Sequence, residues 1–231
     1  MKKYLAALFL AMASTSLLAA TGNVSATYNF IKNGQLVGIT TEHFVRTGSK
    51  YRLESETKAA GVLALFSKQT ILLLSRGTIN KDGLRPEHFE HHPGKDESKN
   101  VSADFDWTTG TATLHRDGNT ETKKIEPGLQ DRISLMYQFM FMKKIPQEID
   151  LNMTNGKNIE QYRYKLVGAE KISTPAGTFN SLHLSRLPQT EDEDKVDLWL
   201  ATSKNHFPVR IIFEEKNHQK LEQLLTNLKI E

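Results

Sequence analysis

Apolar and polar residues alternate along most of the chain, in short runs separated by turn-forming residues. The run 101–107 shows this most clearly, because Ala103, Phe105 and Trp107 fall on one side and polar residues fall on the other. A period of two is typical of strands with one buried face. The runs that predict strands are 28–31, 37–47, 51–57, 69–79, 101–107, 111–116, 122–126, 159–167 and 179–187.

One segment, DRISLMYQFMFM at residues 131–142, breaks this pattern because it is apolar on nearly every side. The segment is longer than a typical strand. Asp131 can cap the start of a helix, and Pro146 follows the end of the run. A helix that is apolar all round must be surrounded. We therefore expect one buried helix inside the concavity of a curved sheet.

The stretch KVDLWLATSKNHFPVRIIF, residues 195–213, predicts a hairpin. If Ala201 lies opposite Pro208, the apolar positions of the two strands share one face. Trp199 then faces Arg210 on the other side, where a cation–π contact is available. His206 lies in the connecting loop without a second catalytic residue type beside it. The stretch therefore indicates a structural hairpin.

The final run, KLEQLLTNLKI at residues 220–230, leaves helix and strand open, because its leucines fit helical spacing. The chain contains no linker, low-complexity block or internal repeat. We expect a mainly β fold, with residues 21–231 as a single β-rich domain. Its architecture is predicted to be one strongly curved antiparallel sheet, a β-roll or an open barrel, with one buried helix.

The first twenty residues, MKKYLAALFLAMASTSLLAA, resemble an export signal. Lys2 and Lys3 precede an apolar run at residues 4–13, and small residues follow. This order predicts a secretory signal peptide at residues 1–20, cleaved after Ala20, or later after Ala26. The apolar run is too short for a transmembrane segment, which needs roughly 20 residues. We expect a periplasmic protein.

The chain has no cysteine, which excludes disulfides and a lipid anchor attached to cysteine. Without Lys2 and Lys3, 28 basic and 27 acidic residues remain, and the two signs are mixed along the chain. Phosphate backbones require a clustered basic surface. We therefore expect no nucleic-acid partner.

Several short motifs occur in a recognisable order, ending in DLWLATSKNHFPVRI. They include YRL at 51–53, LSRG at 74–77, GLRP at 83–86, FDW at 105–107 and GLQDR at 128–132. Over residues 25–215 the chain resembles a family of exported bacterial proteins, domain of unknown function 3108 (DUF3108). The loop departs from the commoner Ala-Pro opening, since it reads Ala201-Thr202. The resemblance implies a periplasmic, β-rich fold and brings no catalytic residues.

The densest polar cluster is PEHFEHHPGKDE at residues 86–97. On a strand, His88 and His92 share a face with Glu90, and these side chains carry donor atoms suited to zinc. The cluster lies beside a Pro-Gly turn and lacks the paired spacing of a structural zinc site. We interpret it as a solvated hairpin end and expect neither a metal site nor a cofactor.

Signatures of catalysis are missing from the sequence. It contains no G-x-S-x-G elbow, no H-E-x-x-H motif and no cysteine nucleophile. Asp104 and Asp106 share a strand face, but nothing apolar beside them would raise a pKa for acid catalysis. We expect a protein that is not an enzyme and has no catalytic residues.

Two apolar features suggest binding instead. Residues 61–66, GVLALF, lie in a connection between strands, and the expected helix is rich in methionine and aromatic residues. Flexible thioethers suit an adaptable apolar pocket. For residues 61–66 the first interpretation is a short helix or turn that caps the core, and the functional alternative is a lid or a tip that touches lipid. For the helix the first interpretation is core filling, and the apolar pocket is the functional alternative. The apolar pocket is predicted to contain Leu65, Phe66, Met136, Phe139 and Met140.

The sequence leaves two functions open. In the first, the curved sheet binds an apolar or lipid-like envelope ligand, such as an acyl chain, between the helix and the inner strand faces. In the alternative, the protein is a cell-envelope scaffold or adaptor. It would then bind another protein through an edge strand or through the C-terminal segment 217–231.

Overall fold

The computed structural model describes residues 22–186, 188, 194–215 and 218–231, so the expected signal peptide at residues 1–20 lies outside them. The strands are β1 (Val24–Lys32), β2 (Gln35–Thr47), β3 (Lys50–Ala59), β4 (Thr70–Asn80), β5 (Gly83–His92), β6 (Val101–Asp106), β7 (Thr111–Arg116), β8 (Asn119–Lys124), β9 (Gln130–Asp131), β10 (Glu148–Thr154), β11 (Ile159–Thr174), β12 (Gly177–Arg186), β13 (Lys195–Ala201), β14 (Phe207–Glu214) and β15 (Lys220–Ile230). The helical segments are α1 (Ser134–Gln138) and the 3-10 turns η1 (Gly61–Leu65), η2 (Glu97–Lys99), η3 (Phe139–Phe141) and η4 (Thr202–Lys204).

All strands belong to one sheet, in the order β8-β7-β6-β5-β4-β3-β2-β1-β15-β14-β13-β12-β11-β10-β9. Neighbours are antiparallel, except that β9 pairs with β10 in parallel. Two meanders, β1 to β8 and β9 to β15, meet where β1 pairs with β15. Within the described ranges, the outermost strands β8 and β9 do not pair with each other, so the sheet is open.

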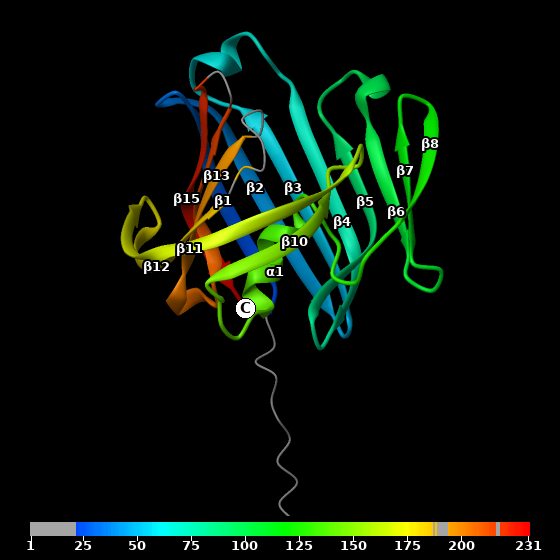
Figure 1. Cartoon of the computed structure of the whole chain (residues 1–231). Coiled ribbons are helices and arrows are strands. Elements are labelled where there is room, and N and C mark those ends of the chain that lie inside the picture. The colour runs from blue at the N-terminus through cyan, green and yellow to red at the C-terminus, as the bar shows by residue number, and fades with distance from the viewer. Residues whose placement is uncertain (1–21, 187, 189–193, 216–217) are drawn as a thin grey trace, which may run out of the picture.

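The sheet curves strongly around α1, and β10 and β11 cross over the concavity (Figure 1). The connection between β10 and β11 reaches the opposite half of the sheet, because Arg116 on β7 donates a hydrogen bond to the carbonyl of Lys157 at 3.2 Å. We call α1 with η3, residues 134–141, the plug. The plug lies on the inner face, where Tyr137 packs in one hydrophobic cluster and Phe139 in a second. The predicted fold, a curved antiparallel sheet with one buried helix, is confirmed.

The plug is shorter than the helix predicted over residues 131–142. Asp131 lies in β9, the α-helix ends at Gln138, and a 3-10 turn follows it. Asp131 still caps the helix, because its Oδ1 accepts the backbone N–H of Ser134 at 2.8 Å. The apolar run predicted too long a helix. Its last residues are apolar because they pack against the core, but they do so from the 3-10 turn.

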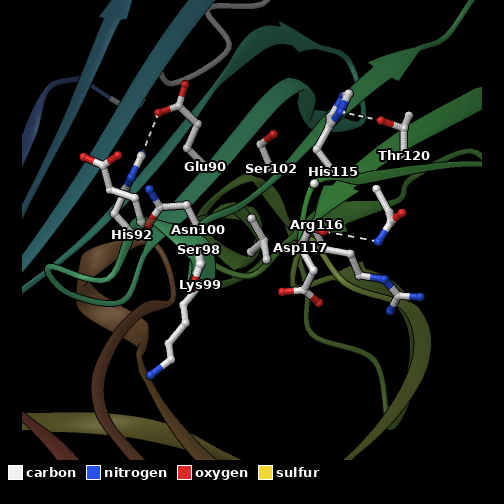
Figure 2. A pocket seen from close by; sticks show the side chains of 14 residues that line it. Glu90, His92, Ser98, Lys99, Asn100, Ser102, His115, Arg116, Asp117 and Thr120 are labelled. Carbon is white, nitrogen blue, oxygen red and sulfur yellow. Dashed lines mark hydrogen bonds and ion pairs between the residues drawn. The ribbon is translucent and has the colours of Figure 1, made fainter.

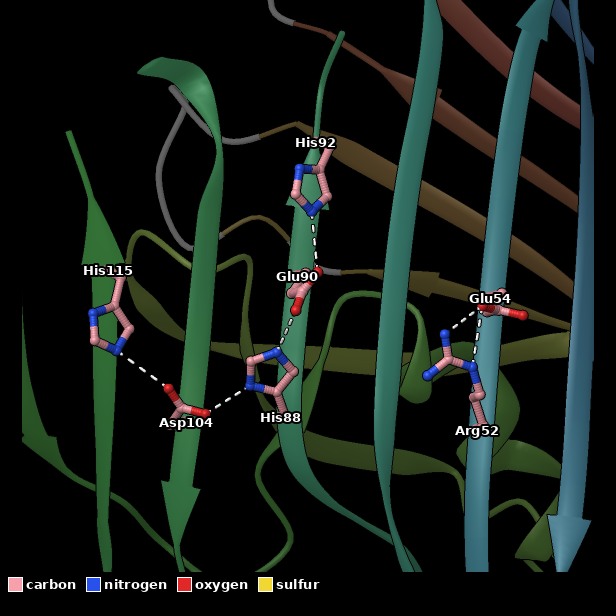
Figure 3. Close-up of polar contacts among 7 residues, drawn as sticks. All are labelled: Arg52, Glu54, His88, Glu90, His92, Asp104 and His115. Carbon is pink, nitrogen blue, oxygen red and sulfur yellow. Dashed lines mark hydrogen bonds and ion pairs between the residues drawn. The ribbon is translucent and has the colours of Figure 1, made fainter. Parts of the chain in front are cut away.

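Strand β5 is a correction to the sequence interpretation, which placed a solvated hairpin end at residues 86–97. Phe89 is fully buried. The side chains of His88, Glu90 and His92 lie together on the outer face of β5 (Figure 3). Pro86 fits within β5 because the pairing with β4 shifts between Arg76 and Gly77. Strand β10 was also missed by the sequence pattern.

The C-terminal segment is a strand in the middle of the sheet, between β1 and β14. The pairing of β1 with β15 shifts between Thr27 and Tyr28, where the partners change from Asn227 to Leu225. This irregularity allows Leu225 and Leu228, three residues apart, to contact the same core cluster. It also explains why the leucines have helical spacing.

The hairpin of β13 and β14 is confirmed. Trp199 pairs with Arg210, and the guanidinium lies 4.9 Å from the centre of the indole ring. The ring of His183 stacks on the indole at 4.4 Å, and the Nε1–H of Trp199 donates to Glu170 at 3.1 Å. One detail differs, since a register shift after Trp199 places Pro208 opposite Leu200 instead of Ala201.

Candidate functional site

The start of the plug is held by a buried carboxyl group, that of Asp131, which is 0% exposed. Its Oδ1 accepts the backbone N–H groups of Ile133 and Ser134, and its Oδ2 accepts the hydroxyl of Ser75 on β4. Burial raises the pKa of Asp131 to about 6, although these hydrogen bonds act in the opposite direction. The carboxyl group thus ties the plug to the middle of β4.

The other end of the plug is attached to the β4–β5 turn. Gln138 donates from Nε2 to the carbonyl of Asp82 at 2.7 Å and accepts the backbone N–H of Leu84 at 2.8 Å. Gly83 lies between these partners with a φ of +110°, and a Cβ there would collide with the Gln138 amide. A side chain at residue 83 would therefore force the Gln138 amide to move and would disturb its two hydrogen bonds.

A second carboxyl group, that of Glu42 on β2, faces the plug from the inner face. The hydroxyl of Tyr137 donates to Glu42 at 3.1 Å, and Ser55 donates at 3.4 Å. Burial raises the pKa of Glu42 to about 7. Tyr137 itself is fixed by ring contacts with Phe44 at 5.4 Å and Phe207 at 5.6 Å.

The apolar side chains of the plug differ in how far they are covered. Phe139 is fully buried and Met140 is 5% exposed, so both are packed as core residues. Met136 is only partly buried and contacts both core clusters. Of the three plug residues predicted for an apolar pocket, Met136 is the one that a ligand could reach without displacing the core.

The inner face of the sheet is covered unevenly along its strands. On β4, Ser75 beside the plug is fully buried, while Leu73, nearer the other end of the strand, is partly buried. On β14, Phe207 is fully buried and Phe213 is partly buried. The plug thus covers one end of the inner face. Toward the other end Leu73 and Phe213 remain partly accessible, while Val196, which pairs with Phe213, is buried.

Leu65 and Phe66 lie at that other end. Turn η1 precedes the first residue of β4, whereas the plug binds the turn that follows the last residue of β4. The exposed fractions of Leu65 and Phe66 are 79% and 83%, so residues 61–66 do not cap the core. The structure therefore separates Leu65 and Phe66 from Met136, Phe139 and Met140 by about the length of β4.

The histidine-rich segment forms a polar row on the outer face of β5, β6 and β7 (Figure 3). His88 lies between Asp104, with a 2.6 Å contact at Nδ1, and Glu90, with a 2.7 Å contact at Nε2. His92 contacts the other oxygen of Glu90 at 3.1 Å, and His115 contacts Asp104 at 3.2 Å. The hydrogen bonds from His88 and His92 lower the pKa of Glu90.

This row holds three strands together through side chains. A neutral imidazole has one N–H group, so both contacts of His88 are hydrogen bonds to ionised carboxylates only when its ring carries two protons. The carboxylates occupy the ring nitrogens that a metal ion would need. Among the described residues, no group of three or more His, Asp or Glu side chains is arranged to hold a metal ion.

A hollow of about 780 Å³ borders this row, between the β5–β6 connection and the β7–β8 turn (Figure 2). A second hollow, of about 390 Å³, lies over β2 to β5 and shares Glu90 and His92 with the first. Some charged groups in the larger hollow are paired, such as Lys99 with Asp96 at 3.3 Å. Neither hollow is lined by the five residues predicted for the apolar pocket, and most residues that line the larger one are polar or charged.

These features define a protein built as one open, curved antiparallel sheet around a short helical plug. Its sequence matches the model of the family described as "Protein of unknown function (DUF3108)" over residues 23–225. The chain belongs to this family, which confirms the resemblance seen in its motifs. No helix in the described part of the chain is long and apolar enough to cross a membrane.

The fold is shared with a β-barrel-like protein of the domain of unknown function DUF1849 from Brucella abortus. The two are 10% identical with a TM-score of 0.60, over 91% of this chain and 98% of that chain. A lower similarity is found to a chain in the complex of MucA and MucB from Pseudomonas aeruginosa, with 12% identity and a TM-score of 0.37. That match covers 91% of this chain and 52% of the other. No curated protein matches the chain.

The sequence pattern missed the importance of Glu42. It occurs in TTEHF, where a single glutamate at an inward position of a strand is the only signal. Its partner Tyr137 is 95 residues away, so the pairing depends on the fold. Asp131 was identified as a cap, but its burial against Ser75 was not foreseeable from local sequence.

Proposed function

We propose that this chain is a non-enzymatic periplasmic protein that binds an apolar or lipid-like envelope ligand, such as an acyl chain, against the inner face of its sheet. The observation that carries the proposal is the uneven cover of that face. Leu73 and Phe213 are apolar, face the concavity and are only partly buried, at the end that the plug leaves uncovered. The export signal predicted at residues 1–20 supports the location.

An acyl chain suits this surface for two physical reasons. Covering accessible apolar side chains gains roughly 25 cal/mol for each Å² removed from water. Met136 adds a flexible thioether that can adapt to chains of different shape. In this arrangement Phe139 and Met140 support Met136 from the core and do not contact the ligand directly.

Native mass spectrometry of the mature protein, purified from periplasm without detergent, tests the proposal. The wild-type protein is expected to carry a mass that matches a fatty acid or a phospholipid and that is lost on solvent extraction. Leu73→Glu places a charge on the inner face and is expected to abolish this mass. Leu72→Glu is the matched control, because the neighbouring side chain lies on the outer face and is 44% exposed. Circular dichroism and a thermal melt establish that both variants fold.

Two results would overturn the proposal. One is a wild-type protein that has no bound mass and also takes up no fluorescent fatty acid after delipidation. The other is a folded Leu73→Glu variant that retains as much ligand as Leu72→Glu, because the ligand would then lie elsewhere.

The alternative function, protein binding through the C-terminal segment 217–231, meets a structural obstacle. The described part of that segment contains β15, which is already paired on both sides. The edge strand β8 remains available, but its sequence NTETKK is exposed and charged. Charged side chains on an edge strand oppose the addition of another strand. We therefore favour the ligand-binding function.

A further inference from the structure

Turn η1 presents an apolar surface to solvent at the uncovered end of the sheet. We call the side chains of Val62, Leu63, Leu65 and Phe66 the apolar tip; their exposed fractions are 73%, 44%, 79% and 83%. Isolated exposed apolar residues are common on soluble proteins, but a contiguous group marks an interaction surface. Four such residues within five consecutive positions form a contiguous group.

The apolar tip is held in place by backbone hydrogen bonds. The N–H of Ala60 donates to the carbonyl of Val37 at 3.0 Å, and the N–H of Ser67 donates to Leu63 at 2.9 Å. Both ends of the turn are therefore tied, the first to β2 and the second within the turn itself. Two further exposed apolar side chains, Leu36 and Ile39, lie on β2, the strand that η1 contacts. The apolar surface thus extends from the tip onto the sheet.

Three lysines lie on segments next to this surface. Lys68 follows the tip directly, and Lys32 ends β1, beside the start of β2. Lys95 lies on the β5–β6 connection, which Gln69 joins to the tip segment by a hydrogen bond to the carbonyl of Pro93. Among the described residues, no ion pair links these three lysines to a carboxylate, unlike Lys58, which is paired with Glu56 at 2.8 Å. Lysines that form no ion pair with a described carboxylate therefore accompany exposed apolar side chains.

We propose that the apolar tip inserts into the headgroup region of an anionic lipid bilayer, with Lys32, Lys68 and Lys95 against the lipid phosphates. Apolar side chains flanked by lysines are the composition that binds such surfaces, because burial of the first and attraction of the second act together. The inference rests on the proposed function for its biological reason, since a protein that binds a lipid-like ligand has to meet the membrane that supplies or receives it. The open end of the inner face and the tip lie at the same end of the sheet.

Co-sedimentation of the mature, full-length protein with vesicles tests the tip. The vesicles are phosphatidylcholine alone, or phosphatidylcholine mixed with phosphatidylglycerol. The double variant Leu65→Ser, Phe66→Ser is expected to weaken binding to the mixed vesicles by at least about tenfold. The control, Val45→Ser with Val167→Ser, removes two apolar side chains of which 46% and 57% are exposed away from η1. This control is expected to bind as the wild-type protein does.

A second pair of variants tests the lysines. Lys68→Gln with Lys95→Gln is expected to weaken binding to the anionic vesicles by about fivefold for each lysine, and to leave the weak binding to phosphatidylcholine unchanged. Lys165→Gln with Lys171→Gln, on β11, removes the same charge from a distant strand and is expected to have less effect. Wild-type protein that stays in the supernatant with both vesicles would overturn the inference. Equal binding by the tip variant and its control would also overturn it.

The failure of this inference can be distinguished from the failure of the proposed function. Ligand retention is measured by mass spectrometry without vesicles, and it depends on Leu73. Vesicle binding is measured on delipidated protein and depends on Leu65 and Phe66. If the protein carries ligand but does not bind vesicles, only the membrane-binding role of the apolar tip is refuted. If it binds vesicles but carries no ligand, only the ligand site on the inner face is refuted.

Discussion

Glu42 makes the stability of this protein depend on pH in a direction that can be derived from the structure. Its carboxyl group contacts Tyr137 and Ser55 on the inner face, and burial raises its pKa from 4.5 to about 7. The folded protein therefore binds a proton more tightly at this site than the unfolded chain does. The resulting stabilisation is fully present below about pH 4.5 and is lost as the pH rises through about 7.

The size of the effect follows from the two pKa values. One pKa unit corresponds to about 1.4 kcal/mol, so a shift from 4.5 to about 7 corresponds to at most about 3 kcal/mol of unfolding free energy. Glu42→Gln removes the charge and keeps groups that can hydrogen-bond to Tyr137 and Ser55. The variant is therefore expected to match the wild-type protein near pH 5. Near pH 8 it is expected to be more stable by as much as about 3 kcal/mol.

Urea unfolding at about pH 5 and about pH 8, followed by tryptophan fluorescence, measures this difference. Asp131, whose pKa burial also raises, is present in both proteins and cancels when the two are compared. Glu54→Gln, on the exposed outer face of β3, serves as the control and is expected to change stability by less than about 1 kcal/mol at either pH. A difference between wild type and Glu42→Gln that stays constant from pH 5 to pH 8 would refute the reasoning.

Two further substitutions test how the plug and the outer face are held. Gly83→Ala is expected to lower the free energy of unfolding in urea by about 2 to 3 kcal/mol, because it combines a positive φ with a collision against Gln138. The control Gly110→Ala has open space around it and is expected to lower it by about 1 kcal/mol. Equal losses in the two variants would contradict the contact. Trp199→Phe removes the hydrogen bond to Glu170 and weakens the contact with Arg210, so a loss of about 1 to 2 kcal/mol is expected, and a thermal melt unchanged from wild type would show that the stack does not stabilise the sheet.

Strands with one buried face and one solvent-exposed face could be predicted from the sequence. The run 101–107 alternates because Ala103 and Phe105 pack against the core while Asp104 stays in water. Strand β5 was hidden for the opposite reason. Its outer face carries imidazoles and carboxylates that pair with one another, so its polar residues resembled a loop, and Pro86 added to that impression. Charge pairing between neighbouring strands is not visible along a single segment.

The candidate site was predictable only in its parts. The apolar character of Phe66 and Met136 is evident from composition, but their separation is not, because it depends on which end of β4 each segment meets. The sequence also cannot reveal that Met136 stays partly accessible while Phe139 is enclosed, since both lie in one apolar run. Burial within such a run is decided by the strands around it.

The pairing of β1 with β15 has a consequence for the order in which parts of the sheet can fold. Each meander consists largely of hairpins between consecutive strands, which form early because little chain entropy is lost. The seam between the meanders joins Val24 to Ile230, almost the whole length of the described chain. Synthesis begins at the N-terminus, so one edge of β1 stays unpaired until β15 has been made. The last strand to be made therefore joins the two meanders into one sheet. Until β15 has paired with β1, the inner face of the sheet is not continuous.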